Sequence, residues 1–165
     1  MMNSSNKSTL YNAQDGLGYC LSRAAQIMQS TVDEALAELE LGRLSWMVLA
    51  CIRFDGVTSP SQIARFVGLE RSSASRLISR LEELDYVRRE TDTADGRGYS
   101  LKPTTRGMQI CEQAPGLIQA ATRPYLADLS DNETGQLIGL LKRIGTDVDS
   151  VWNADSVSVN RRSEP

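Results

Sequence analysis

Apolar residues recur at the spacing of an α-helix along most of the chain, so the sequence predicts a mainly α-helical protein. A first long helix is expected over residues 15–40, because apolar residues form one continuous stripe there. A short, buried helix is expected over residues 45–54. Asp55 and Gly56 follow it and are expected to end it, since both residue types favour turns.

The C-terminal part of the chain predicts two more helices. The first is expected over residues 104–126, with a kink or break near residues 111–113, because Pro115 cannot donate the backbone hydrogen bond of a regular helix. The last is expected to begin at a capping box formed by Ser130 and the glutamate three residues later, and to continue to Trp152.

Between these helices the sequence has the pattern of a helix-turn-helix. Ser59 is a suitable N-cap, Pro60 suits the first helical position, and Gln62 completes a capping box. Gly68 is expected to end this helix in the left-handed conformation, and a second helix is expected over residues 71–84. Small side chains near the turn would let the two helices cross closely.

The polar face of that second helix is basic and rich in serine. Residues 71–80 include three arginines and no acidic residue, although the chain as a whole is acidic. Arginine suits phosphates and base edges, and serine hydroxyls suit base edges, so this face is a candidate DNA-reading surface. The alternative is a solvated helix face that happens to be basic. The candidate face carries Arg71, Ser72, Ser73, Ser75, Arg76, Ser79 and Arg80.

Two short β-like runs follow, at residues 86–90 and 99–102, and predict a hairpin. The turn between them holds Asp95 and, two residues later, Arg97 between two glycines. An arginine at the end of a hairpin can enter a narrow groove, and a neighbouring carboxylate can orient its guanidinium by charge-assisted hydrogen bonds. Taken alone, the same residues would also fit an ordinary charged hairpin.

The order helix-turn-helix, two-stranded wing, long helix resembles the multiple-antibiotic-resistance regulator (MarR) family of winged-helix transcription factors. The family's wing signature is D-x-R, six residues, then T-x-x-G, and it fits without a gap on Asp95, Arg97, Thr104 and Gly107. A proline precedes the threonine where the family usually has leucine, and proline is well tolerated where a helix begins. The resemblance covers roughly residues 15–150.

The resemblance implies a winged helix-turn-helix regulator whose first, fifth and sixth helices intertwine with those of a second copy. Such a homodimer places two recognition helices about 34–36 Å apart, which suits successive major-groove turns of a pseudo-palindromic operator in double-stranded DNA. The residues expected to contact DNA are Ser59, Ser61, Arg71, Ser72, Ser73, Ser75, Arg76, Arg80, Asp95 and Arg97.

The same resemblance sets the organisation of the chain. Residues 13–152 would form the winged helix-turn-helix with its long N- and C-terminal dimerisation helices, and residues 45–103 its DNA-reading lobe. The polar residues 1–12, and residues 153–165, which lack a helical period, are expected to be flexible tails.

The net charge of −3 at pH 7 is unusual for a DNA-binding protein, so the distribution of charge matters. Residues 60–106 hold nine Lys and Arg against seven Asp and Glu, a local charge of +2, and the remainder of the chain carries −5. Such an asymmetry orients a protein on DNA and limits non-specific binding.

Composition indicates one soluble globular domain, with 165 residues of which 41% are apolar and 24% charged. No apolar run approaches the roughly 20 residues that span a bilayer, and the polar N-terminus does not look like a signal peptide. Cys20, Cys51 and Cys111 are widely spaced within apolar helical patterns, which indicates reduced core thiols and a cytoplasmic protein.

Little in the sequence favours an enzyme. It contains no histidine, a common general base and metal ligand, and no cysteine spacing typical of a metal site. It has no Gly-rich phosphate loop and no nucleophile elbow, and the pair Asp92 and Asp95 is expected to be solvated in its loop. We therefore expect no catalytic residue, no metal and no cofactor. A winged helix used for protein contacts is a second alternative, which the basic helix face and Arg97 disfavour.

The sequence leaves open which signal would control DNA binding. In the family's organic-hydroperoxide sensors, a reactive cysteine lies early in the first helix, and tyrosines of the partner's second helix form hydrogen bonds to it. By alignment, that cysteine position falls on Gly18 and the tyrosine positions fall on Arg43 and Trp46. Cys20 is therefore expected to be a buried structural thiol, and a thiol switch at Cys20 is the alternative.

The other option is a small ligand, often an aromatic acid in this family, between the dimerisation helices and the DNA-reading lobe. Arg23 could pair with a carboxylate while Trp46 stacks on an aromatic ring. Core packing is the alternative role for Trp46 and Met47. The residues expected to line such a site are Tyr19, Arg23, Trp46, Met47, Arg53 and Cys111.

Overall fold

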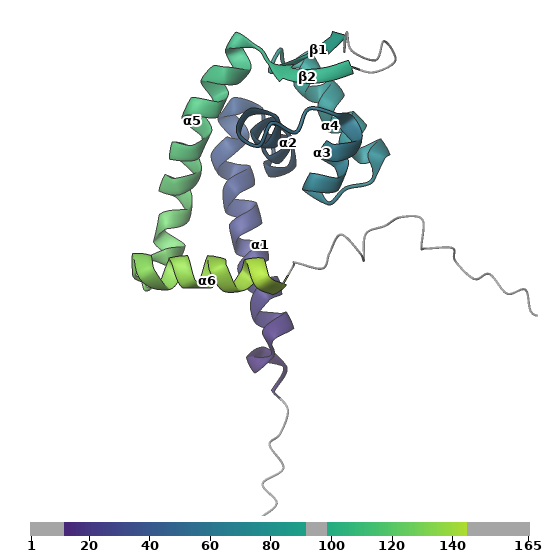
Figure 1. The fold of residues 1–165 in the computed structure, drawn as a ribbon. Helices are drawn as coiled ribbons and strands as arrows, with labels where there is room; N and C mark the ends of the chain where they lie inside the picture. Colours follow the sequence, from purple (N-terminus) through teal and green to yellow (C-terminus); the bar gives the residue numbers. More distant parts are fainter. Residues whose placement is uncertain (1–11, 92–98, 145–165) are drawn as a thin grey trace, which may run out of the picture.

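The computed structural model describes residues 12–91 and 99–144 of the chain. Within these ranges the protein is mainly α-helical with a two-stranded antiparallel sheet, as the sequence predicts (Figure 1). The α-helices and strands are α1 (Leu17–Leu36), α2 (Arg43–Phe54), α3 (Pro60–Val67), α4 (Arg71–Glu83), β1 (Val87–Thr91), β2 (Tyr99–Pro103), α5 (Thr105–Thr122) and α6 (Asp131–Ile144). The short 3-10 helices are η1 (Ala13–Asp15), η2 (Ala37–Leu39) and η3 (Arg123–Leu126).

The elements are arranged in two parts (Figure 1). Helices α2, α3 and α4 pack together with the β1–β2 sheet into a lobe, while α1 and α5 lie side by side and extend away from it. Helix α6 crosses the end of α5 that is far from the lobe. The wing is therefore at one end of the molecule and α6 at the other.

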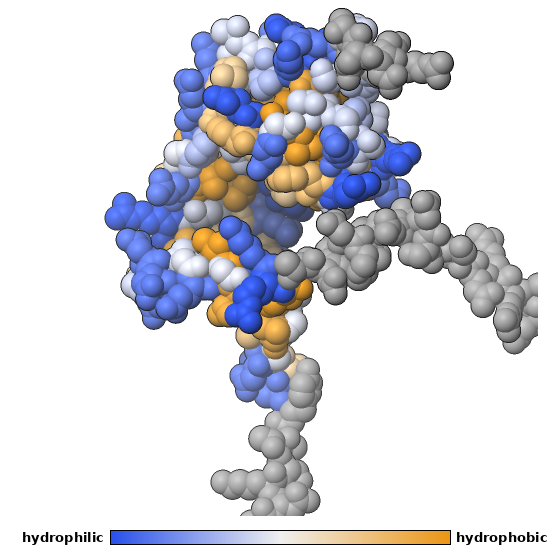
Figure 2. All heavy atoms as spheres, viewed as in Figure 1, coloured by the Kyte–Doolittle hydropathy of each residue, from blue (hydrophilic) through white to orange (hydrophobic). Residues whose placement is uncertain are grey.

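The core lies where the C-terminal end of α1 meets the lobe. Its fully buried side chains include Leu36, Leu49, Ile63, Ile78, Leu81, Tyr86 and Leu101. Helix α6 buries none of its side chains, and Leu137, Ile138, Leu140, Leu141 and Ile144 are exposed. Apolar surface accordingly gathers over α6 and the neighbouring part of α1, in the lower half of Figure 2.

The first α-helix is shorter than predicted at both ends. Asp15 belongs to η1 and Gly16 has an extended backbone, so α1 begins at Leu17. At the other end the backbone tightens into η2 after Leu36. Glu40 then turns the chain with a left-handed backbone (φ 54°), and α2 begins at Arg43, two residues earlier than predicted.

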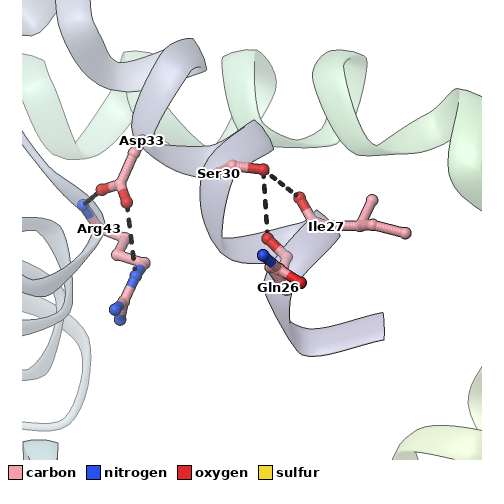
Figure 3. Close-up of polar contacts among 5 residues, drawn as sticks. All are labelled: Gln26, Ile27, Ser30, Asp33 and Arg43. Atoms are coloured by element: carbon pink, nitrogen blue, oxygen red, sulfur yellow. Dashed lines mark hydrogen bonds and ion pairs between the residues drawn. The ribbon is translucent and has the colours of Figure 1, made fainter. Parts of the chain in front are cut away.

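Asp33 joins α1 to the start of α2 (Figure 3). Its carboxylate accepts a hydrogen bond from the backbone N–H of Arg43 at 2.6 Å and lies 3.5 Å from the Arg43 Nε. Gly42, the N-cap of α2, has no side chain that could do this, and a Cβ there would lie 3.3 Å from the Asp33 carboxylate. The first turn of α2 is therefore capped by a side chain of another helix, which places a negative charge at the helix N-terminus.

The helix-turn-helix prediction is confirmed. The Ser59 hydroxyl accepts a hydrogen bond from the Gln62 N–H at 3.4 Å and so caps α3. Gly68 ends α3 with a left-handed backbone (φ 71°), a conformation that favours glycine. Ala64 of α3 and Ala74 of α4 are both buried, and their small side chains allow the two helices to pack closely.

The sequence predicts a kink or break near residues 111–113, and the break is absent, because α5 is continuous from Thr105 to Thr122. Proline removes one backbone donor, but packing holds this helix in place: Ala114 is fully buried, and α5 lies along α1. The Pro115 side chain itself is exposed. The α-helix instead gives way to η3 at Arg123, immediately before Pro124.

Helix α6 begins with the predicted capping box. The Ser130 N–H donates to the Glu133 carboxylate at 2.8 Å, and the Glu133 N–H donates to the Ser130 hydroxyl at 3.3 Å. Hydrogen bonds from the Ser130 hydroxyl and N–H hold the pKa of Glu133 below its usual value. The predicted extension of this helix to Trp152 lies outside the described residues, as do most of the predicted tails.

A set of contacts that we call the Thr104 clasp (Asp85, Tyr86, Thr104 and Gly107) joins α4, the base of the sheet and α5. The Thr104 N–H donates to the Tyr86 carbonyl at 3.1 Å, and the Thr104 hydroxyl donates to the Asp85 carbonyl. The same hydroxyl accepts from the Gly107 N–H at 3.0 Å and so caps α5. A Cβ on Gly107 would lie 1.9 Å from the Tyr86 carbonyl oxygen. The T-x-x-G half of the wing signature is therefore structural.

Tyr86 links the clasp to the first part of the chain. Its side chain is buried, its hydroxyl donates to the Leu39 carbonyl at 2.9 Å, and its N–H donates to the Leu81 carbonyl at 2.8 Å. The Arg106 guanidinium lies 5.1 Å from the centre of its ring. The Tyr86 N–H bonds to α4 and not to the other strand. Strand β1 accordingly begins at Val87, one residue later than predicted.

Gly107→Ala is expected to destabilise the protein by about 1–3 kcal/mol, because the new methyl group overlaps a main-chain oxygen that no rotamer change can move. Gly116→Ala is the matched control, since Gly116 lies in the same helix with open space beside its Cα. The control should be neutral or more stable by about 0.5–1 kcal/mol. Urea unfolding followed by circular dichroism measures both variants, and equal stabilities would contradict the packing described.

Candidate nucleic-acid interface

Helix α4 has a buried side and an exposed side. Ala74, Ile78 and Leu81 face the core. On the opposite side Arg71, Ser72, Ser75, Arg76 and Arg80 are exposed, while Ser73 and Ser79 are half-buried. The structure thus brings the sequence-predicted reading face together on one side of one helix.

The two serines predicted at the start of α3 differ in their surroundings. The Ser59 hydroxyl caps the helix and also lies 2.9 Å from the side-chain carbonyl oxygen of Gln62, so it is engaged within the protein. Ser61 is exposed on the first turn of α3. Both residues lie at the N-terminal end of α3, where backbone N–H groups favour an anion such as a phosphate.

Arg80 is held by two carboxylates. Its Nη2 lies 3.6 Å from Glu40, and its Nη1 lies 3.3 Å from Glu83, one turn later in the same helix. All three side chains are at least half exposed, so each pair contributes only about 0–1 kcal/mol. A phosphate can therefore compete with either carboxylate for this guanidinium.

The two strands of the wing pair in antiparallel register, with Val87 opposite Pro103 and Thr91 opposite Tyr99. The predicted strand bounds are thus correct to within one residue. Asp95 and Arg97, the predicted wing residues, lie outside the described residues.

Glu90 ties the two strands of the wing together. Its carboxylate bonds to the guanidinium of Arg88 on its own strand at 2.8 Å and to the Lys102 ammonium on the other strand. Hydrogen bonds from Lys102 and then Arg88 hold the pKa of Glu90 below its usual value. Arg88 and Lys102 both count toward the local positive charge of residues 60–106. The Glu90 carboxylate beside them neutralises part of that charge.

Arg89 forms the connection between the wing and α4, and the sequence gives no prediction for it. Its Nε lies 2.7 Å from the Glu82 carboxylate, and its guanidinium carbon lies 4.5 Å from the centre of the Tyr99 ring. The partners are seven and ten positions away along the chain, and no helical or strand period relates them. Two arginines followed by a glutamate at residues 88–90 are the sequence signal that could have indicated pairing here.

The six predicted ligand-lining residues fall into two groups. Tyr19 and Arg23 are exposed on the N-terminal half of α1, where Arg23 donates to the side chain of Gln26 at 3.4 Å. Trp46, Met47 and Arg53 lie on α2 and Cys111 on α5; Trp46 is half-buried, Met47 and Arg53 are exposed, and Cys111 is buried.

Aromatic contacts order the second group. The Trp46 and Phe54 rings meet edge to face with centres 6.4 Å apart, and the Arg53 guanidinium lies 5.6 Å from the Phe54 ring centre. A different place, an open depression of about 600 Å³, is lined by α3 and the loop before it, including Val57, Arg65 and Phe66. None of the six predicted residues lines that depression.

The cysteines differ from the prediction at one position. Cys51 and Cys111 are buried as predicted, but Cys20 is exposed, so its assignment as a buried thiol is wrong. The N-terminal part of α1 extends beyond the lobe (Figure 1). The Cys20 thiol is exposed and donates to the Gln14 carbonyl at 3.5 Å. Burial and the nearby charge of Asp55 raise the pKa of Cys51 to about 11, and burial raises the pKa of Cys111.

Within residues 12–91 and 99–144, no cluster of three or more Cys, Asp or Glu side chains could hold a metal ion. No helix in them is both long enough and apolar enough to cross a bilayer.

Known proteins share this architecture. The sequence model of the MarR family matches residues 39–98. A MarR mutant from E. coli, complexed with operator DNA, is similar over 83% of this chain and 99% of that chain, with 28% identity and a TM-score of 0.70. CouR from Rhodococcus jostii RHA1, bound to p-coumaroyl-CoA, is similar over 81% and 94%, with 29% identity and a TM-score of 0.71. A MarR-family regulator from Rhodococcus sp. RHA1 is similar over 82% and 97%, with 28% identity and a TM-score of 0.73.

The helix-turn-helix, the two-stranded wing and the long flanking helices define a winged helix-turn-helix transcription regulator. The family-model match over residues 39–98, together with the structural similarity over most of the chain, relates this chain to the MarR family. Members of this family are DNA-binding regulators and not enzymes.

In the folded protein at pH 8, we expect Cys51 and Cys111 to resist maleimide labelling. Burial blocks access to both, and their raised pKa values keep the reactive thiolate scarce well above neutral pH. Cys20→Ser should therefore remove the fast-reacting thiol, whereas full unfolding should make the two remaining cysteines reactive. Mass spectrometry of timed samples measures this. Rapid labelling of the folded Cys20→Ser variant would contradict the burial described.

Proposed function

We propose that the protein is a repressor that binds a pseudo-palindromic operator as a homodimer and leaves it when a small ligand binds. The observation that carries the proposal is the exposed arginine–serine face of α4, set in a helix-turn-helix that a wing follows. The complex of a MarR mutant from E. coli with operator DNA supports DNA as the partner.

Within this proposal the parts of the reading face have different roles. Four residues in the first part of α4 would face base edges, where short hydroxyls and forked cations discriminate between bases: Ser72, Ser73, Ser75 and Arg76. Arg80, one turn later, would meet a phosphate, and Ser59 and Ser61 would add contacts at the start of α3. By resemblance, Arg97 would enter the minor groove with its guanidinium oriented by Asp95.

The homodimer is supported by the apolar surface that one chain leaves open. Leu17 and Tyr19 on α1 are 65% and 44% exposed, and five large apolar side chains of α6 are exposed as well. An apolar surface that spans two helices indicates an interface, and a second copy of the same chain would cover both. Two reading faces about 34–36 Å apart would then recognise one operator.

Single substitutions on α4 test the DNA-binding part of the proposal. Arg80→Ala should weaken binding to all duplexes alike. It should also make the negative slope of log K against log salt concentration shallower by about one, because one phosphate contact is lost. Arg76→Ala should instead change which sequence is preferred. Selection from a pool of randomised duplexes, followed by salt titrations, measures both effects.

The same experiment separates the alternatives. If the folded wild-type protein selects no sequence, the winged helix serves protein contacts and the DNA proposal is wrong. If Arg80 proves more sequence-selective than Arg76, α4 lies on DNA in a different orientation from the one proposed. Sedimentation of the complex should give two chains per selected duplex.

The proposed ligand is an aromatic acid or its thioester. The complex of CouR with p-coumaroyl-CoA supports this class, since an aromatic thioester is bound there by a protein of similar fold. Arg23 would pair with an anionic group, and Trp46 offers an aromatic face. Ligand binding can release DNA only if the ligand prefers the conformation that DNA disfavours. A 100-fold loss of operator affinity requires a difference of about 2.7 kcal/mol per dimer, and DNA must then weaken ligand binding equally.

The exposure of Cys20 favours a second candidate, a thiol switch. The Cys20 thiol is exposed in the single chain, and an exposed thiol can be oxidised. The two signals make different demands on α1: the ligand requires Arg23, and the oxidant requires Cys20.

A screen of aromatic acids and their thioesters, by thermal shift and then by DNA release, tests the ligand. Arg23→Ala should raise the concentration needed for release about tenfold or more, because a charge-assisted pair is lost. Arg65→Ala, which removes an exposed arginine on α3, is the control and should leave that concentration unchanged. If hydrogen peroxide releases the DNA while no such compound does, and Cys20→Ser abolishes the response, the thiol switch is correct and the ligand proposal is wrong.

A further inference from the structure

Arg89 on β1 makes a two-point contact with the last turn of α4. Its Nε lies 2.7 Å from one oxygen of the Glu82 carboxylate, and its Nη2 donates to the other oxygen at 2.9 Å. Two parallel N–H···O bonds between a planar guanidinium and a carboxylate fix both the distance and the relative orientation of the groups that carry them. This contact therefore sets the angle between β1 and α4 as well as joining them.

A second group, the Tyr99 ring, contacts the same guanidinium. Its carbon lies 4.5 Å from the centre of the Tyr99 ring, a distance typical of a cation–π contact. Tyr99 belongs to β2, where it pairs with Thr91. Arg89 is thus held between the recognition helix and the second strand of the wing.

The neighbouring arginine has a different set of contacts. Arg88 is 60% exposed and pairs with Glu90, whose carboxylate also bonds to Lys102. Side chains at successive positions of a strand point to opposite faces, so the two adjacent arginines serve different purposes. The Arg88 contacts stay within the wing, while the Arg89 contacts connect the wing to α4.

We propose that Arg89 is a positioning residue for DNA recognition. It fixes β1 and β2 against the last turn of α4, so that the reading face of α4 and the wing meet DNA in one relative orientation. The positive charge of Arg89 suggests a contact with a DNA phosphate, but in this proposal Arg89 positions the wing instead. The inference rests on the proposed DNA-binding function.

A two-stranded hairpin supplies a physical reason for such a contact. Two strands on their own are marginally stable in water, so the wing depends on the rest of the protein for its orientation. The Thr104 clasp fixes the base of the wing, at Tyr86 and Thr104, but it lies at one end of the strands. Arg89 adds a second point of attachment further along β1. Two attachment points fix the direction of the wing relative to α4. DNA binding then loses less conformational freedom in the wing.

The test compares operator affinity among single variants, with a duplex that the wild-type protein selects from a randomised pool. Arg89→Gln and Glu82→Gln should each weaken binding about three- to tenfold. Arg89→Lys should lose nearly as much, because an ammonium keeps the charge but forms neither the two parallel bonds nor the planar stack. Arg88→Gln is the matched control for charge and should change the affinity less than twofold. Thermal unfolding confirms that each variant is folded.

A second comparison distinguishes positioning from general stabilisation. In an Arg97→Ala background the wing has lost its proposed DNA contact. Adding Arg89→Gln to that variant should therefore reduce the operator affinity less than twofold. A full loss in that background, a wild-type affinity for Arg89→Lys, or an equal loss for Arg88→Gln would each overturn the proposal.

The two proposals also fail in different ways. If Arg97→Ala weakens binding while Arg89→Gln does not, the positioning role is wrong and the DNA-binding function stands. If the wild-type protein selects no duplex, the proposed function itself is wrong.

Discussion

The main-chain carbonyl of Tyr86 is the contact on which the other parts of the structure depend. The Thr104 N–H bonds to it, Gly107 lies too close to it for any side chain, and the Tyr86 hydroxyl reaches back to Leu39. Backbone groups held at such short range adjust little, because rotamer changes cannot relieve an overlap between them. Helix α4, the wing and α5 therefore keep one arrangement. The family signature combines two functions: its second half builds this junction, and its first half is proposed to contact DNA.

Contacts within the molecule distinguish cations that a net charge treats alike. The chain carries −3 in total, yet the exposed side of α4 is basic. Arg88, Arg89 and Lys102 belong to the same basic region of the sequence, but each bonds to a carboxylate of the lobe. A count of charges along the chain treats all these cations alike, whereas the contacts separate those that shape the wing from those that face outward.

Local patterns predicted most of the fold, because helix caps, left-handed glycines and helical periodicity act within a few residues. The helix-turn-helix with Ser59 and Gly68, and the capping box of α6, are confirmed on these grounds. The errors arose where distant packing decides. Ala114 and its neighbours keep α5 continuous through Pro115, and Cys20 is exposed because α1 extends beyond the lobe. The reading face of α4 follows from its period, but the Arg89–Glu82 contact joins positions with no shared period, so sequence alone could not reveal it.

The first helix has a consequence for how the reading lobe holds together. Leu36 is fully buried in the core, the Leu39 carbonyl accepts a hydrogen bond from the Tyr86 hydroxyl, and Asp33 caps the first turn of α2. These residues all precede residue 45, where the sequence suggests that the lobe begins. A fragment that started there would lack part of its own interior and the cap of its first helix. The lobe and the long helix therefore form one cooperative unit, and a movement of α1 deforms the lobe's interior directly, without passing through a flexible hinge.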